Sequence, residues 1–75
     1  MKTEAQSLVG QIFQHYRNGK NYEVVAIGWC TDRDIEVIFY KPLYPCEHAM
    51  FTRSYHSFFE QVENEGKIVP RFKKL

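Results

Sequence analysis

The chain has 75 residues and a formal net charge of +1 with neutral histidines, which is the size of one small domain. This near-neutral charge gives no general electrostatic argument for nucleic acid and counts against a general DNA binder, because such a protein needs a basic excess. Two cysteines are too few for a disulfide scaffold, and no apolar run is long enough to span a bilayer. The first eight residues lack the apolar core of a signal peptide, so we expect a cytoplasmic protein with free thiols and no membrane partner.

The composition favours strands over helices. Six Phe, five Tyr and one Trp stand beside only three Leu, and aromatic and β-branched side chains fit a pleated sheet. We expect residues 1–9 to form a lead-in or a short helix. Residues 10–75 are expected to form a single small β-barrel domain.

A β-hairpin is predicted near the start of the chain. The pair Asn18-Gly19 is a strong turn signal, because both residues tolerate the positive φ that a tight hairpin turn needs. We expect strands over residues 10–17 and 22–29, with Gly28 ending the apolar run of the second strand. Alternation along the first strand predicts two faces, one with Ile12, Gln14 and Tyr16 and the other with Phe13, His15 and Arg17.

Two further strands are expected on either side of a rigid loop. The third strand covers residues 34–40, and its alternation places Ile35, Val37 and Phe39 on the inward face. Two prolines within residues 41–48 predict a non-helical loop. The fourth strand then covers residues 49–54.

A helical turn and a second hairpin are expected to complete the fold. Ser54 is placed to cap a single turn within residues 55–61, which would bring Phe58 or Phe59 into the core. The last hairpin is predicted to turn at Glu65-Gly66, and Pro70 indicates an edge position for its final strand.

This order of elements predicts a mainly β fold, a small SH3-like β-barrel of about five short strands with one helical turn before the last strand. Barrel closure or near-closure would also protect exposed strand edges. An OB-type barrel is the nearest alternative, although it would need longer strands and a fuller helix.

Several motifs with matching spacing resemble one bacterial family. The opening Gly10-x-x-Phe13-x-His15-Tyr16-Arg17-x-Gly19-x-x-Tyr22-x-Val24 resembles its G-x-x-Y-x-H-Y-K-G and Y-x-V pattern. The segment from Val37 to Tyr44 is similar to its V-V-Y-R-x-L-Y, and the ending from Phe58 to Phe72 is similar to its F-x-x-x-V-x-x-x-G-x-x-V-P-R-F. The resembled family is domain of unknown function 1653. The resemblance implies a small, mostly β, cytoplasmic bacterial or phage protein and no settled activity.

The sequence gives little support for an enzyme. It contains no Ser-His-Asp set, no phosphate-binding glycine loop and no paired-carboxylate motif. The spacing of Cys46 and His48 with Cys30 and His56 does not fit a zinc site, so we expect no metal and no cofactor. A small hydrolase built on Cys46, His48 and His56 is the weakest hypothesis.

Aromatic and arginine residues alternate along the chain and give the main functional hypothesis. Rings stack on bases or other rings, and guanidinium groups bind phosphate or carboxylate. We therefore predict a binding module for an anionic ligand, such as a nucleotide, single-stranded nucleic acid or an acidic peptide. The candidate ligand-binding residues are His15, Tyr16, Arg17, Tyr40, Tyr44, Arg53 and Arg71. The alternative is a protein-interaction or self-assembly module without a small ligand, and the oligomeric state stays open.

Overall fold

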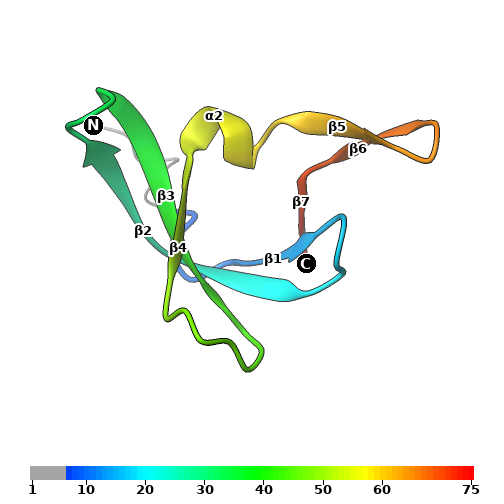
Figure 1. The fold of residues 1–75 in the computed structure, drawn as a ribbon, viewed down its shortest axis with the longest axis horizontal. Helices are drawn as coiled ribbons and strands as arrows, with labels where there is room; N and C mark the ends of the chain where they lie inside the picture. The colour runs from blue at the N-terminus through cyan, green and yellow to red at the C-terminus, as the bar shows by residue number, and fades with distance from the viewer. Residues whose placement is uncertain (1–6) are drawn as a thin grey trace.

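The computed structural model describes residues 7–75, and within this range the protein is mainly β, with one helical turn before its last strands, as predicted (Figure 1). The elements in chain order are β1 (Ile12–His15), β2 (Asn21–Cys30), β3 (Ile35–Pro42), β4 (Phe51–Ser54), α2 (Tyr55–Phe58), β5 (Gln61–Asn64), β6 (Lys67–Pro70) and β7 (Phe72–Lys74). The predicted lead-in over residues 1–9 lies partly outside the described residues, and residues 7–10 form turns.

The strands form one five-stranded antiparallel sheet and one two-stranded ribbon. The order in the sheet is β4-β3-β2-β1-β7, and the ribbon consists of β5 and β6. The ribbon extends away from the sheet, and the chain then returns so that β7 pairs with β1 (Figure 1). Within residues 7–75 no ladder joins β4 to β7, so the observed pairing is that of an open sheet rather than a closed barrel.

The first hairpin is present, but its turn differs from the expected two-residue form. Tyr16, Arg17, Asn18 and Gly19 make the loop, and His15 and Lys20 bracket it through a backbone hydrogen bond of 3.0 Å. Only Gly19 of this loop has a positive φ, +69°. Asn18 instead accepts a hydrogen bond from the Lys20 amide on its side-chain oxygen, at 2.8 Å. The Asn side chain thus stabilises the turn without entering the left-handed region.

β2 covers the predicted second strand, and Gly28 lies inside it. The strand continues to Cys30, Gly28 pairs with Val37, and the irregularity lies between Val24 and Ala26. A Cβ at residue 28 would lie 2.9 Å from the ring of Phe39. Glycine is therefore required here for the close approach of a ring on the neighbouring strand.

The face of β3 that points into the core is the opposite of the predicted one. Ile38 and Tyr40 are 0% and 6% exposed and belong to the core, whereas Ile35 and Phe39 are only partly buried. Val37 is buried as well, on the opposite face. When a strand is apolar on both faces, its sequence does not show which face points into the core. The elements that pack against the strand then decide this.

The helical turn and the last hairpin match their predictions. The side-chain oxygen of Ser54 accepts a hydrogen bond from the Ser57 amide at 3.1 Å and caps α2. Glu65 and Gly66 have φ values of 55° and 79°, the paired positive values of a type I′ turn. Pro70 ends β6 opposite Gln61 in the ribbon, so its missing N–H lies outside the main sheet.

An aromatic cluster forms the core on one face of the sheet. Phe58 of α2 stacks on Phe72 of β7, with ring centroids 4.1 Å apart and planes at 4°. Phe13 meets Phe58 edge to face at 5.3 Å, and Tyr40 lies 5.4 Å from Phe58. The core thereby joins the helical turn to β1, β3 and β7. No helix within residues 7–75 has the length and apolar character needed to cross a membrane.

We predict that Phe58→Ala lowers the free energy of unfolding by about 3–5 kcal/mol, because it removes a fully buried ring and leaves a cavity. Phe59→Ala is the matched control, since this neighbouring ring is 37% exposed and should lose less than half as much. Urea denaturation followed by circular dichroism measures both. Equal losses in the two variants would contradict the assigned core.

Candidate functional site

A pocket of about 190 Å³ opens beside the aromatic core. Every strand of the main sheet contributes to it, and the first hairpin loop adds one residue. Its lining residues are His15, Asn18, Tyr22, Tyr40, Phe51, Arg53 and Phe72. Three of these, Tyr22, Tyr40 and Phe72, also belong to the core cluster. The pocket is therefore built on rigidly packed side chains rather than on mobile loops.

Aromatic rings form most of the wall. The rings of Tyr40 and Phe51, which lie opposite each other on β3 and β4, are 5.9 Å apart and tilted by 34°. Tyr22 meets Tyr40 edge to face at 5.5 Å and Phe72 at 5.9 Å. Edge-to-face contacts of this kind fix the ring orientations. The wall therefore presents a preformed apolar surface to the pocket.

The hydroxyl of Tyr22 joins two loops. It receives a hydrogen bond from the Asn18 side-chain amide at 3.2 Å, and it lies 2.8 Å from the hydroxyl of Tyr44. The hydrogen bond with Tyr22 raises the pKa of Tyr44 to about 12, so this phenol stays neutral at physiological pH. Tyr44, predicted as a ligand-binding residue, thus positions Tyr22 and does not line the pocket itself.

Arg53 brings the positive charge into the pocket. Its Nη1 donates a hydrogen bond to the Ser57 hydroxyl at 3.1 Å, and its guanidinium lies 5.9 Å from the ring centroid of Phe72. Its Nε is buried and has no hydrogen-bond partner. Within residues 7–75, no carboxylate lies at ion-pair distance from Arg53. Among the described residues, Arg53 is thus a partly buried cation without a counter-charge.

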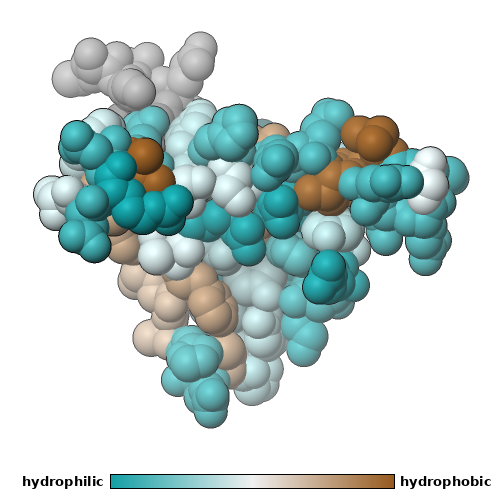
Figure 2. Space-filling view, turned by 45° about the horizontal axis from the view of Figure 1, so that its top comes forward, coloured by the Kyte–Doolittle hydropathy of each residue, from teal (hydrophilic) through white to brown (hydrophobic). Residues whose placement is uncertain are grey.

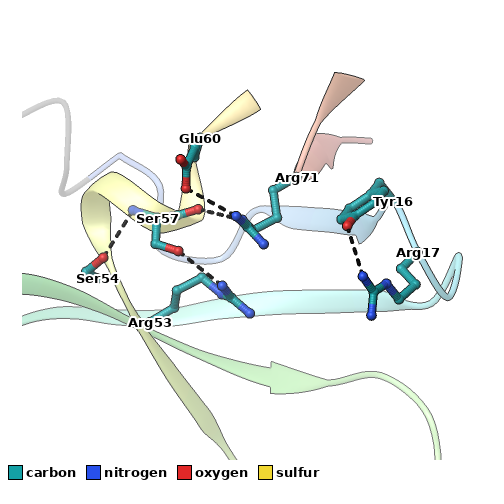
Figure 3. Close-up of polar contacts among 7 residues, drawn as sticks. All are labelled: Tyr16, Arg17, Arg53, Ser54, Ser57, Glu60 and Arg71. Carbon is teal, nitrogen blue, oxygen red and sulfur yellow. Dashed lines mark hydrogen bonds and ion pairs between the residues drawn. The ribbon is translucent and has the colours of Figure 1, made fainter. Parts of the chain in front are cut away.

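Arg71, between β6 and β7, reaches the same helical turn (Figure 3). Its Nε donates to the backbone oxygen of Ser57 at 3.0 Å, and its Nη2 pairs with the Glu60 carboxylate at 3.1 Å. Ser57 therefore binds Arg53 through its hydroxyl and Arg71 through its carbonyl. Because Glu60 compensates its charge, Arg71 acts mainly as a structural link.

His15 is the titratable group of the pocket. Its Nδ1 accepts a hydrogen bond from the Arg17 amide at 3.2 Å, so the neutral ring carries its proton on Nε2. Its ring lies 4.9 Å from Phe72, edge to face. Desolvation lowers the pKa of His15 below the usual 6.5, and the charges of Arg53, Arg71 and Arg17 lower it further. Three arginines therefore create a positive potential at this ring.

Tyr16 and Arg17 stand apart from this pocket. An Arg17 side-chain nitrogen lies 3.5 Å from the Tyr16 hydroxyl on the first hairpin loop (Figure 3). Tyr16 instead lines a neighbouring pocket, which also contains His15.

The structure brings only part of the predicted ligand-binding set together. His15, Tyr40 and Arg53 line one pocket, whereas Tyr16, Arg17, Tyr44 and Arg71 lie beside it or stabilise its wall. Asn18 and Phe72 at the site, and Ser57 behind it, were not predicted as site residues. The hairpin register could have identified Phe51, which pairs directly with Tyr40.

The residues of the hydrolase hypothesis, Cys46, His48 and His56, all lie at the surface. Cys46 and His48 are both exposed, and His48 contacts the neighbouring Glu47 at 3.6 Å. Among residues 7–75, no three His, Cys, Asp or Glu side chains gather in a way that could hold a metal ion.

Fold and pocket together define a small antiparallel β protein with an aromatic wall and an uncompensated arginine. The chain belongs to the family DUF1653, proteins of unknown function, whose family model matches residues 11–74. This confirms the resemblance seen in the sequence. The structure is similar to the crystal structure of a DUF1653 protein from Bordetella bronchiseptica, with a TM-score of 0.80 and 25% identity, covering 95% of this chain and 91% of that one. A search of curated proteins finds no match.

We predict that His15 titrates below pH 6.5, and that Arg53→Gln raises its pKa by removing a nearby cation. Between the folded pKa and 6.5 the unfolded chain binds more protons, so the free energy of unfolding falls as the pH falls through this window. NMR titration of the His15 ring protons measures the pKa in both proteins. A His15 pKa at or above 6.5 in the unmodified protein would contradict the assigned environment.

Proposed function

We propose that this protein is a binding module for an anionic ligand, whose charged group lies between Arg53 and His15. The observation that carries the proposal is the state of Arg53. Its Nε is buried without a hydrogen-bond partner, and no carboxylate within residues 7–75 compensates its charge. A partly buried cation is unfavourable unless an opposite charge approaches it. A bound anion would supply that charge.

The neighbouring groups suit an anion. Neutral His15 offers an N–H donor on Nε2, and the arginine charges around it favour negative charge at the same place. Hydrogen bonds to a charged group contribute about 1.5–3 kcal/mol each. The aromatic wall of Tyr22, Tyr40 and Phe51 excludes water from one side, which strengthens these interactions.

The size of the pocket limits what enters it. About 190 Å³ is below the ~300–1,000 Å³ that is usual for pockets enclosing a whole small-molecule ligand. We therefore propose that the pocket holds a phosphate, sulfate or carboxylate group, and that the rest of the ligand lies outside it. This is compatible with a nucleotide, a nucleic-acid strand or an acidic side chain.

We predict that sulfate binds in this pocket and that Arg53→Gln weakens its binding about tenfold or more, because a charge-assisted contact is lost. Arg33→Gln is the control, since Arg33 is an exposed residue that lies outside this pocket. Chemical-shift titration of the backbone amides measures the dissociation constant and locates the site. Sulfate keeps its charge at pH values around the pKa of His15. The affinity for sulfate should therefore rise as the pH falls and His15 becomes protonated.

Equal weakening in the two arginine variants would contradict the proposal. Sulfate-induced shifts confined to residues far from His15 and Arg53 would do so as well.

Self-association through the ribbon of β5 and β6 is a second candidate function. Ile68 is 67% exposed, and Figure 2 shows hydrophobic residues gathered over the ribbon at the right of the view. Each ribbon strand pairs only with the other among the described strands, so each keeps one free edge. Free edges and exposed apolar side chains favour pairing with a second copy of the chain.

If the ribbon mediates self-association, sedimentation velocity should show a dimer at tens of micromolar, and Ile68→Lys should convert it to a monomer. The charge would be buried at the interface in that variant. Lys67→Ala, on the same strand, is the control. A monomer at every concentration of the unmodified protein would remove this candidate.

A further inference from the structure

One edge of the main sheet, formed by β4, has free backbone groups. Among the described strands, β4 pairs only with β3. The N–H and C=O of Val24 in β2 bond to the segment before β1, so Tyr40, which pairs with Val24, directs its own N–H and C=O toward β4. Alternation along the ladder of β3 and β4 then leaves the N–H and C=O of Thr52 directed out of the sheet.

The anion pocket borders this edge on the core face of the sheet. Phe51 and Arg53 line the pocket from β4. They pair with Tyr40 and Ile38 of the core, so their side chains point to the core face. A strand added beside β4 would place one residue opposite Arg53 on that face. An acidic residue at this position would supply the carboxylate that Arg53 lacks among residues 7–75.

A pocket of about 210 Å³, here called the outer pocket, borders β4 on the opposite face. Thr52 and Ser54 line it from β4, and their partners in the ladder, Phe39 and Val37, line it from β3. These four side chains share one face, which is the face away from Arg53. Trp29 also borders the outer pocket and is 58% exposed. The outer pocket therefore offers apolar surface beside the free edge.

An added strand is a form of ligand that reaches both faces of the sheet. Its backbone bonds to the free edge, and its successive side chains point alternately to the two faces. One side chain would enter the anion pocket, and the side chains before and after it would lie over the outer pocket. The two pockets therefore match the side-chain pattern of one extended peptide.

We propose that the ligand is an extended acidic peptide segment of a partner protein, which pairs with the free edge of β4. An acidic residue lies opposite Arg53 and directs its carboxylate between Arg53 and His15. The residues on either side of it are apolar and pack over the outer pocket. Because β4 has four residues, a short peptide covers its edge. This inference rests on the anion site proposed above and narrows its ligand to a peptide.

Other free edges and other ligands fit the observations less well. β7 also ends the main sheet, but it carries Lys73 and Lys74, and lysines on an edge strand oppose pairing with another chain. The ribbon strands have free edges, but no ribbon residue lines the anion pocket. A nucleotide could use the anion pocket, but it would leave the backbone edge of β4 unpaired.

The test compares two pentapeptides, each acetylated and amidated, by amide chemical-shift titration. In Thr-Val-Glu-Val-Thr both valines point to the side opposite the acid, whereas in Val-Thr-Glu-Thr-Val they point to the same side as the acid. The two peptides have the same composition. We expect the first to bind about tenfold tighter, because only its valines reach the outer pocket. Gln in place of its Glu should weaken binding about tenfold or more.

Hydrogen exchange reports the backbone pairing directly. Saturation with Thr-Val-Glu-Val-Thr should slow the exchange of the Thr52 amide about tenfold or more, because this amide gains a hydrogen bond. The Arg53 amide is the internal control, since it already points to β3. Its exchange should slow less.

A matched pair of variants separates the strand edge from the anion pocket. Thr52→Pro removes the N–H that points out of the sheet, and proline is tolerated on the free side of an edge strand. It should weaken binding of Thr-Val-Glu-Val-Thr about tenfold or more and leave sulfate binding unchanged. Thr52→Ala is the control, because it keeps the N–H, and it should change peptide affinity less than about twofold. If Thr52→Pro does not fold, the two pentapeptides and the exchange of the Thr52 amide decide.

The outcomes distinguish this inference from the function on which it rests. Sulfate binding at Arg53, combined with equal affinities for the two pentapeptides or an unprotected Thr52 amide, would overturn strand addition and leave the anion site standing. No binding of sulfate or of either peptide would overturn both. A tetranucleotide that shifts residues around Arg53 and binds tighter than Thr-Val-Glu-Val-Thr would overturn the peptide and assign the anion site to nucleic acid.

Discussion

The contact between Phe58 and Phe72 organises this small protein. α2 has only four residues and β7 only three, and elements of this length are not stable by themselves. The stacked rings, 4.1 Å apart, hold both elements against the sheet. With α2 fixed, the hydroxyl and carbonyl of Ser57 face Arg53 and Arg71. The position of the positive charges thus follows from a hydrophobic contact.

The same packing explains why the pocket combines apolar walls with an unpaired cation. Tyr40 and Phe72 serve both the core and the pocket, so the wall is as rigid as the core. Arg53 lies over the edge of that core with its Nε buried and unpartnered. A buried cation without a partner costs stability in the free protein, and the anion proposed above would supply the missing interaction.

The sequence predicted those features that depend on local chemistry. The Ser54 cap, the Glu65-Gly66 turn and the burial of Phe58 or Phe59 follow from neighbouring residues, and the structure buries Phe58. The prediction of which face of β3 points into the core was wrong, because the strand is apolar on both faces. Of the seven ligand-binding residues predicted from the sequence, three line one pocket in the structure: His15, Tyr40 and Arg53. The linking role of Ser57 could not be predicted, because the contact between Ser57 and Arg71 joins distant elements that only the folded chain brings together.

Pairing between β1 and β7 gives the pocket an unusual dependence on the whole chain. His15 comes from the first strand and Phe72 from the last, and the two lie opposite each other in this ladder. The pocket therefore exists only after the most distant described parts of the sequence have met, a step with a large loop-closure entropy. Any molecule that occupies the pocket would contact both β1 and β7 and would favour their pairing. By mass action it would stabilise the complete fold and not a fragment of it.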